Sequence, residues 1–238
     1  MGTIGAMSDA TDASPRTPSI TAAEGGPFRL SGRVPIRPAD YVYAEDGSPM
    51  TWTFGEPLEV DGDEVALCRC GHSDDKPFCD GSHADAEWDA SDAERPAASY
   101  AERARRKASP DGDYELLDDT KLCTHAGLCA TAKKTVWQMM PDTDDPEVRG
   151  TVIRMVEKCP SGRLVNVIGG DEVEPSLPLE IGVVPGGPLW VTGGLEVTGA
   201  SGEPLETRNR VTLCRCGASG NKPLCDGSHK DIEFEGIS

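Results

Sequence analysis

The sequence contains the same sixteen-residue cassette twice, and this duplication constrains the fold more than any other feature. The first copy, CRCGHSDDKPFCDGSH, runs from Cys68 to His83, and the second, CRCGASGNKPLCDGSH, runs from Cys214 to His229. Corresponding cysteines, prolines and histidines are all 146 positions apart (68 and 214, 83 and 229), so the cassette is repeated without an insertion. Three cysteines and one histidine within so short a segment, found twice, predict two metal sites.

The spacing within the cassette indicates how four ligands converge. Cys68 and Cys70 are two residues apart, so their side chains point the same way in an extended segment. The Lys-Pro step that follows predicts a turn, and Cys79 and His83 are four residues apart, which is one helical turn. Two ligands from an extended segment and two from a helical turn suit either a two-iron cluster or one tetrahedral zinc ion.

The cassette resembles, at every defined position, the CDGSH iron–sulfur domain family typified by mitoNEET. The resemblance implies one 2Fe–2S cluster in each copy, bound by three cysteines and one histidine. The resemblance, and not the spacing, selects iron over zinc. The C-x-C spacing only makes zinc less favoured, because structural zinc sites more often use C-x2-4-C pairs. The implied metal and cluster ligands are Cys68, Cys70, Cys79 and His83 in the first copy, and Cys214, Cys216, Cys225 and His229 in the second.

The composition predicts a small apolar core and an acidic surface. Only 5% of the residues are aromatic and 37% are hydrophobic, so we expect metal binding to supply much of the folding free energy. The net charge of -18 disfavours nucleic acid and anionic membrane as partners, because both are anionic. An acidic surface suits docking to a basic patch on a redox partner, although it also serves solubility alone.

All nine cysteines fall into three groups of three, which leaves none for a disulfide and predicts metal sites in a reducing compartment. No stretch has the apolar length of a transmembrane helix, and the N-terminus lacks the basic and apolar regions of a secretion signal. We therefore expect a cytoplasmic protein with no membrane partner.

Strand-like segments precede each cassette. Residues 27–36, PFRLSGRVPI, alternate apolar and polar residues, and residues 188–197, PLWVTGGLEV, are their counterpart in the second half. These segments are 161 positions apart (27 and 188), so the first half holds fifteen extra residues before its cassette, which we place in a loop and hairpin over residues 39–57. The strands VALC and VTLC then lead directly into the two sites.

These features predict an α+β protein: two small strand-rich CDGSH halves with a small ferredoxin-like α+β domain between them. The family resemblance implies that the halves form a pseudo-twofold pair within one chain, so that a monomer is self-sufficient. The basic run at 103–107 has two interpretations, a solvated helix that bridges the two lobes and a docking patch for an acidic partner. We favour the solvated helix, because charge runs usually mark exposed faces. The expected boundaries are 1–26 for a disordered tail, 27–90 for the first CDGSH domain, 91–112 for a helical linker, 113–170 for the ferredoxin-like domain and 171–238 for the second CDGSH domain.

The third cysteine group lies between the cassettes and consists of Cys123, Cys129 and Cys159, with His125 inside the C-x5-C spacing. A helix that begins at Pro146 is predicted to deliver Cys159, which is followed by proline as in ferredoxins. The segment resembles the divergent ferredoxin-like domain described as a 4Fe–4S mono-cluster family, and also three-cysteine ferredoxins that hold 3Fe–4S. Three thiolates hold a 3Fe–4S cluster unaided, whereas 4Fe–4S needs a fourth ligand, for which His125 is the nearest candidate.

We expect this chain to transfer electrons and not to be an enzyme. Its four histidines all lie in or beside the three sites, which leaves no independent general base, and no nucleophile motif or phosphate loop is present. The expected partner is a reductase or an electron acceptor. The alternatives are a cluster store or donor for an apo-acceptor protein, a redox or pH sensor, and a structural zinc module.

The histidine ligands predict acid-sensitive clusters, because protonating the coordinating ring nitrogen breaks its bond to iron. On mild acidification, we expect the visible absorbance of the native protein to decay faster than that of a variant carrying His83→Cys and His229→Cys. Stopped-flow absorbance measures both rates, and equal rates would contradict histidine ligation.

Overall fold

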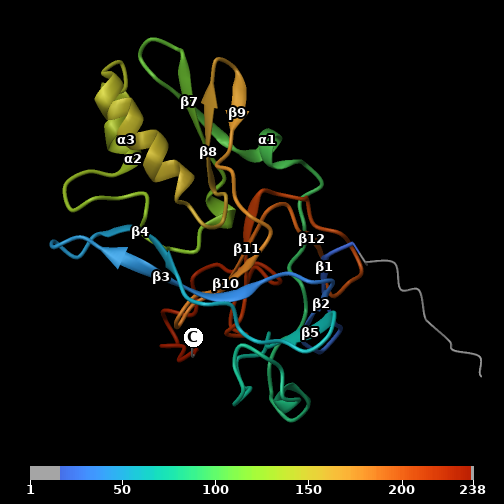
Figure 1. The fold of residues 1–238 in the computed structure, drawn as a ribbon. Helices are drawn as coiled ribbons and strands as arrows, with labels where there is room; N and C mark the ends of the chain where they lie inside the picture. The colour runs from blue at the N-terminus through green and yellow to red at the C-terminus, as the bar shows by residue number, and fades with distance from the viewer. Residues whose placement is uncertain (1–16, 237–238) are drawn as a thin grey trace, which may run out of the picture.

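A computed structural model describes residues 17–236, and these residues form three small β-sheets with few helices (Figure 1). The α+β class is therefore as predicted. No helix within the described range is long and apolar enough to cross a membrane. Residues 1–16 of the predicted disordered tail lie outside the described residues.

Two of the sheets are built jointly by the two halves of the sequence. The first sheet has the order β12-β1-β2-β5 and the second has the order β13-β11-β10-β3-β4. In the first sheet the strands are β1 (Ser19–Ala22), β2 (Phe28–Ser31), β5 (Glu64–Leu67) and β12 (Glu196–Thr198). In the second sheet they are β3 (Ile36–Tyr43), β4 (Pro49–Phe54), β10 (Ile181–Val183), β11 (Leu189–Thr192) and β13 (Arg210–Leu213).

Each half contributes one strand to the sheet of the other half. β1 pairs in parallel with β12, with Ile20 opposite Val197, and β10 pairs in parallel with β3, with Ile181 opposite Ile36. Ile20 and Ile181 are equivalent positions of the two halves, as are Ile36 and Val197, and both are 161 apart in the sequence, so the two registers are equivalent. The inward-facing apolar residues of both halves form one core, which includes Ile20, Phe28, Leu30, Leu67, Ile181, Leu189, Val191 and Leu213.

The two cassette loops meet beside the core. Gly71 and Gly217 both have positive φ angles, 85° and 79°. A Cβ atom at Gly71 would overlap with the carbonyl group of Cys216, and one at Gly217 would overlap with that of Cys70. The contact is reciprocal, and only glycine allows the backbones to approach so closely.

The extra residues of the first half form the hairpin of β3 and β4, as predicted. The ring of Trp52 in this hairpin lies 4.4 Å from that of Tyr41 and 4.5 Å from that of Trp190 in the second half. The indole Nε1 of Trp52 also donates a hydrogen bond to the carbonyl of Lys158, at 3.1 Å. The hairpin therefore joins the first half to the second and to the central domain.

The central domain has its own sheet of order β6-β7-β8-β9, with helices on one face. Its elements are β6 (Arg105–Ala108), β7 (Tyr114–Asp118), β8 (Leu164–Ile168), β9 (Asp171–Val173), α2 (Val136–Met139) and α3 (Pro146–Glu157). The predicted helix ending before Cys159 is α3, which Asp145 caps by accepting a hydrogen bond from the Glu147 amide. Its buried face packs on Tyr114 and Leu116.

Three predicted boundaries are wrong. Residues 19–22 of the predicted tail form β1, because Ile20 and Ala22 are buried between β2 and β12. The predicted helical linker is helical only at α1 (Tyr100–Arg103), and most of its basic run forms β6, whose backbone pairs with β7. Residues 171–173, assigned to the second CDGSH domain, form β9 and pair with β8 of the central sheet.

Arg210 of β13 joins the second half to the central domain and is 1% exposed. Its guanidinium donates to the carbonyl oxygens of Val156 and Leu164, at 3.2 and 3.0 Å, and forms an ion pair with Glu174. This guanidinium therefore satisfies backbone groups at the ends of α3 and β8.

Replacing Arg210 by methionine should lower the free energy of unfolding by about 3 kcal/mol, because it leaves a partly buried carboxylate and two carbonyls without their partner. Arg33→Met is the matched control, since Arg33 pairs with Asp63 while 86% of its side chain is exposed; its loss should cost less than about 1 kcal/mol. Urea denaturation of the purified protein measures both, and equal effects would contradict a structural role for the buried pair.

Candidate metal centres

In each cassette, the C-x-C cysteines follow directly from a strand and converge. Cys68 and Cys70 come after β5 and have their Sγ atoms 3.8 Å apart, and Cys214 and Cys216 come after β13 with a separation of 3.9 Å. Two thiolates on one tetrahedral metal, with bonds of about 2.3 Å, stand about 3.8 Å apart. Both pairs therefore have the separation needed to hold one metal atom.

The second pair in each cassette is a cysteine and a histidine on one short turn. The Nδ1 atom of His83 is 3.3 Å from Cys79 Sγ, and that of His229 is 3.3 Å from Cys225 Sγ. In the first copy the 3-10 helix is Ser82–Ala84, and the Asp80 carboxylate accepts the Ser82 amide at 2.9 Å, as an Asx turn does. Nδ1 is therefore the ring nitrogen that faces the metal position.

Backbone hydrogen bonds hold the two pairs together. The Cys68 amide donates to the carbonyl of Pro77 at 2.8 Å, and the Cys79 amide donates to that of Ala66 at 2.9 Å. In the second copy the bonds from Cys214 to Pro223 and from Cys225 to Thr212 have the same lengths, 2.8 and 2.9 Å. The predicted turn after the Lys-Pro step thus returns the chain so that both pairs lie against the end of one strand.

The candidate donor side chains of each cassette lie in two pairs, one Cys–Cys and one Cys–His. Among residues 17–236, no three or more His, Cys, Asp or Glu side chains gather around the position of a single metal ion. A 2Fe–2S cluster takes two protein ligands on each of its two irons, and histidine can replace cysteine among them. The paired spacing fits that cluster.

Burial shifts the pKa of several of these candidate ligands. It raises the pKa of Cys225 to about 12 and that of Cys70 to about 11, so both thiols carry protons at neutral pH until a metal displaces them. Burial also lowers the pKa of His229, which leaves its imidazole neutral at pH 7. A neutral ring offers the lone pair that metal binding requires.

An arginine lies inside each C-x-C, and the sequence analysis assigned no role to it. Arg69 is 1% exposed and donates to the carbonyl of Ala23 at 3.0 Å, and Arg215 is 1% exposed and donates to that of Val184 at 2.6 Å. Each guanidinium also interacts electrostatically with a cysteine of the other copy: Arg69 with Cys214, and Arg215 with Cys68. A buried cation there favours bound thiolates electrostatically.

The three cysteines of the central domain line one cavity of about 220 Å³. Cys123 and Cys129 lie in the loop before α2, and Cys159 follows α3. Burial raises the pKa of Cys129 to about 11, and the backbone amide of His125 points at Cys123 Sγ from 3.4 Å. The sequence-predicted thiols therefore come together around a cavity fit for an inorganic cluster.

Arg163 is a residue of this cavity that the sequence analysis did not identify. Its guanidinium forms an ion pair with Asp118 at 2.6 Å, stacks over the Trp137 ring at 4.8 Å and lies beside the Cys123 thiol. The only sequence signal was an arginine four residues after Cys159. A cation next to a cluster ligand stabilises the more negative, reduced state.

His125, the candidate fourth ligand of a 4Fe–4S cluster, lies between the cysteine-lined cavity and the second cassette. Its φ angle is 57°, and its ring packs against Gly227 in the second cassette. The residue still borders the cysteine-lined cavity. His125 therefore lies at the contact between the central domain and the second cassette.

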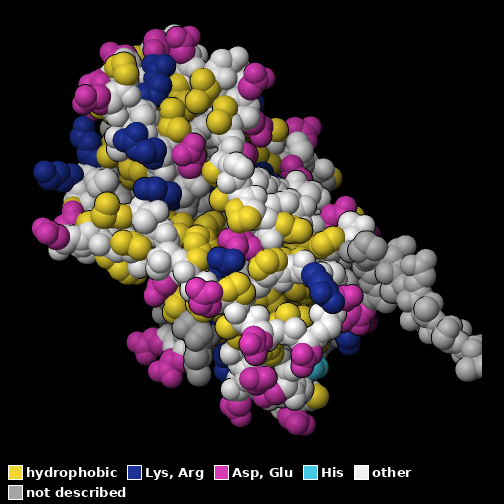
Figure 2. Space-filling model, viewed as in Figure 1, with side chains coloured by type: hydrophobic (Ala, Val, Ile, Leu, Met, Phe, Trp, Pro, Cys, Tyr) yellow, Lys and Arg dark blue, Asp and Glu magenta, His cyan; other side chains and the backbone are white. Residues whose placement is uncertain are grey.

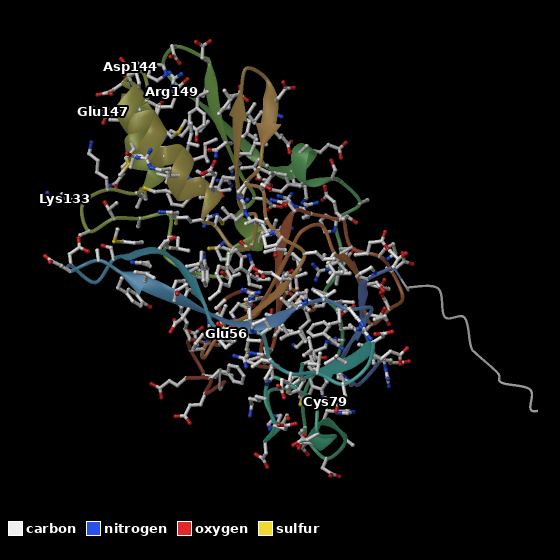
Figure 3. The ribbon with its side chains drawn as sticks, in the orientation of Figure 1. Glu56, Cys79, Lys133, Asp144, Glu147 and Arg149 are labelled. Carbon is white, nitrogen blue, oxygen red and sulfur yellow. The ribbon has the colours of Figure 1, made fainter. Side chains whose placement is uncertain are left out.

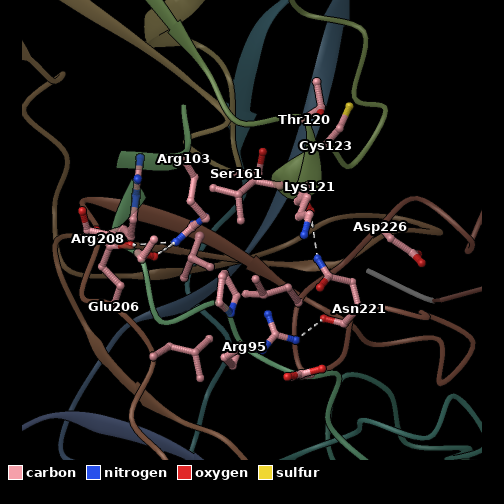
Figure 4. Close-up of a pocket in the computed structure, with 18 of the residues that line it drawn as sticks. Arg95, Arg103, Thr120, Lys121, Cys123, Ser161, Glu206, Arg208, Asn221 and Asp226 are labelled. Carbon is pink, nitrogen blue, oxygen red and sulfur yellow. Dashed lines mark hydrogen bonds and ion pairs between the residues drawn. The ribbon is translucent and has the colours of Figure 1, made fainter. Parts of the chain in front are cut away.

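A larger cavity of about 900 Å³ opens beside this contact (Figure 4). Residues of the linker, the central domain and the second half line it, among them Arg95, Cys123, Glu206, Arg208 and Asn221. The Arg95 guanidinium donates to the carbonyl of Asn221 at 2.8 Å, which ties the linker to the second cassette.

Comparison with known families agrees with this arrangement. The family model for the iron-binding zinc finger of CDGSH type matches residues 25–84 and 186–230, and the model for the divergent 4Fe–4S mono-cluster matches residues 110–168. The chain combines two CDGSH domains with one divergent 4Fe–4S mono-cluster domain. This tandem CDGSH protein is therefore an iron–sulfur protein. No curated protein matches the chain.

Replacing Arg163 by methionine should shift the reduction potential of the central centre to more negative values, by on the order of tens of millivolts, because a nearby positive charge is lost. Arg163→Lys should retain most of the native potential. Arg149→Met removes the same charge at the far end of α3, where Arg149 pairs with Asp111, and should have little effect. Redox titration followed by electron paramagnetic resonance measures these potentials, and a shift shared by Arg149→Met would exclude a local effect.

Proposed function

We propose that this tandem CDGSH protein is a multi-cluster electron carrier. Each CDGSH cassette would bind one 2Fe–2S cluster through three cysteines and one histidine, and the central domain would bind one 4Fe–4S or 3Fe–4S cluster. The observation that carries the proposal is the set of ligand pairs, 3.3 to 3.9 Å apart in each cassette, next to a cavity lined by three thiols.

The arrangement of the three sites supports electron transfer within the chain. The two cassette loops are in contact at Gly71 and Gly217, and the central cysteine loop contacts the second cassette at Gly227. Replacing an anionic thiolate by a neutral imidazole raises the reduction potential of a cluster, so each CDGSH centre accepts electrons more readily than an all-cysteine centre. The chain's own residues then hold three redox centres in a connected series.

The equivalent registers of the exchanged strands support a pseudo-twofold pair. In the first half, Arg69 binds the carbonyl of Ala23 and stacks near Trp88; in the second, Arg215 binds that of Val184 and stacks near Phe234. We propose that the chain works as a monomer, because this pairing is completed within one polypeptide.

The proposed partner is a reductase or an acceptor protein with a basic surface, given the net charge of -18. We propose no enzymatic activity of its own, and no nucleic-acid or membrane partner. The nine cysteines are all free thiols, which supports a reducing compartment such as the cytoplasm.

A second candidate function is cluster storage or donation to an apo-acceptor protein. The partial exposure of Cys79 and His83 favours it, because an accessible histidine ligand eases release. Mixing the loaded protein with an apo-ferredoxin separates the two functions: a donor loses its clusters to the acceptor, whereas an electron carrier cycles with a reductase and keeps them.

Metal and sulfide analysis of anaerobically purified protein tests the proposal. We expect about seven or eight iron atoms per chain with matching acid-labile sulfide, from two 2Fe–2S clusters and one 3Fe–4S or 4Fe–4S cluster. A paramagnetic signal in the oxidised protein would identify the central cluster as 3Fe–4S. A colourless protein with zinc and no labile sulfide would overturn the proposal in favour of a structural zinc module.

A further inference from the structure

The two cassettes have nearly the same local structure but different surroundings. Gly81 and Gly227 occupy equivalent positions in the C-D-G-S-H turn, with φ angles of 96° and 94°. A Cβ atom at Gly81 would meet nothing within 4 Å, whereas one at Gly227 would lie 2.6 Å from Cδ2 of His125. The central domain therefore covers the turn of the second cassette and leaves that of the first uncovered.

Two positions at which the cassette copies differ make this contact. Lys230, which stands where the first copy has Ala84, donates its ammonium to the carbonyl of His125 at 2.6 Å. Asn221, which stands where the first copy has Asp75, donates its side-chain amide to the carbonyl of Lys121 at 2.8 Å. Both donors are specific to the second copy, and both bind the loop that carries Cys123.

The exposure of the ligands follows the same division. Cys225 is 3% and His229 is 7% exposed, whereas Cys79 and His83 are only partly buried. Figure 3 places Cys79 at the end of the molecule remote from Arg149 and Glu147 of the central domain. The space-filling view shows acidic side chains gathered over that end (Figure 2).

We infer that the loop of residues 120–129 is a cap over the second cassette and that the two copies have different roles. The capped second site is closed to other proteins and adjoins the central centre, while the open first site is the face that meets a partner protein. This inference rests on the proposed iron–sulfur function. Exposed acidic residues surround the open site, namely Asp74, Asp75, Asp80 and Asp85. The partner surface that fits this site is therefore basic.

Site-resolved iron removal tests the cap. The loaded protein is mixed with an iron chelator and a thiol-alkylating reagent, and peptide mass spectrometry follows the alkylation of Cys79 and Cys225 separately. In the native protein we expect Cys79 to react at least roughly tenfold faster, the factor that corresponds to one hydrogen bond from a charged donor. Equal rates at the two cysteines would overturn the inference.

Exchanging the differing residues gives a matched pair of variants. Asn221→Asp with Lys230→Ala gives the second cassette the residues of the first at the two positions that make the contact, and should bring the alkylation rate of Cys225 close to that of Cys79. Asp75→Asn with Ala84→Lys makes the reverse change where no domain is docked, and should leave the rate at Cys79 within about twofold of native. A Cys225 rate that stays slow in the first variant would contradict the assigned contacts.

Amide hydrogen exchange of the whole protein gives a readout that does not depend on iron release. Gly227→Ala and Gly81→Ala add the same Cβ at the same backbone angle, but only Gly227→Ala displaces His125. We expect faster exchange over residues 121–129 in Gly227→Ala alone. Equal exchange in the two variants would overturn the cap, whereas absence of iron and sulfide from the native protein would overturn the proposed function instead.

Discussion

Each candidate metal site depends on the backbone hydrogen bonds that bring its C-x-C segment to its C-D-G-S-H turn. Neither pair alone provides four donors, and the segment between the pairs is short and polar. The bonds from Cys68 to Pro77 and from Cys79 to Ala66 fix the turn against the end of β5. Because β5 itself is held by β2 and the shared core, the position of the ligands is set by the sheet rather than by the loop.

The exchange of strands explains how halves with so few apolar residues form a stable support. The short strands β1 and β10 each lie between a strand of their own half and one of the other half. Neither half buries its apolar face alone, and together they form a single core. The copies are then distinguished by additions, namely the β3–β4 hairpin in the first and the contacts of Arg210, Asn221 and Lys230 in the second.

The parts of the fold that the sequence predicted are those with local signals. The duplicated spacing predicted the close Cys–Cys and Cys–His pairs, the VALC and VTLC segments predicted β5 and β13, and Pro146 with its apolar stripe predicted α3. The strand exchange was not predictable, because it joins short segments 177 residues apart (20 and 197) and 145 residues apart (36 and 181), and no local pattern encodes such pairing. β1 was missed because its Ser- and Thr-containing segment resembles a tail until β12 covers it.

The buried arginines were unpredictable for a related reason, since arginine is seldom fully buried without a partner. Their tertiary surroundings account for them. Burial lowers the pKa of Arg215 to about 10, while cysteines of both copies, Cys68 and Cys216, oppose that shift when they are thiolates. A metal cluster would keep its cysteine ligands ionised, so a loaded site would add negative charge beside this guanidinium. We expect cluster binding to stabilise the two arginines, which donate hydrogen bonds to the carbonyls of Ala23 and Val184. We therefore expect cluster binding and the folding of the small shared core to be coupled.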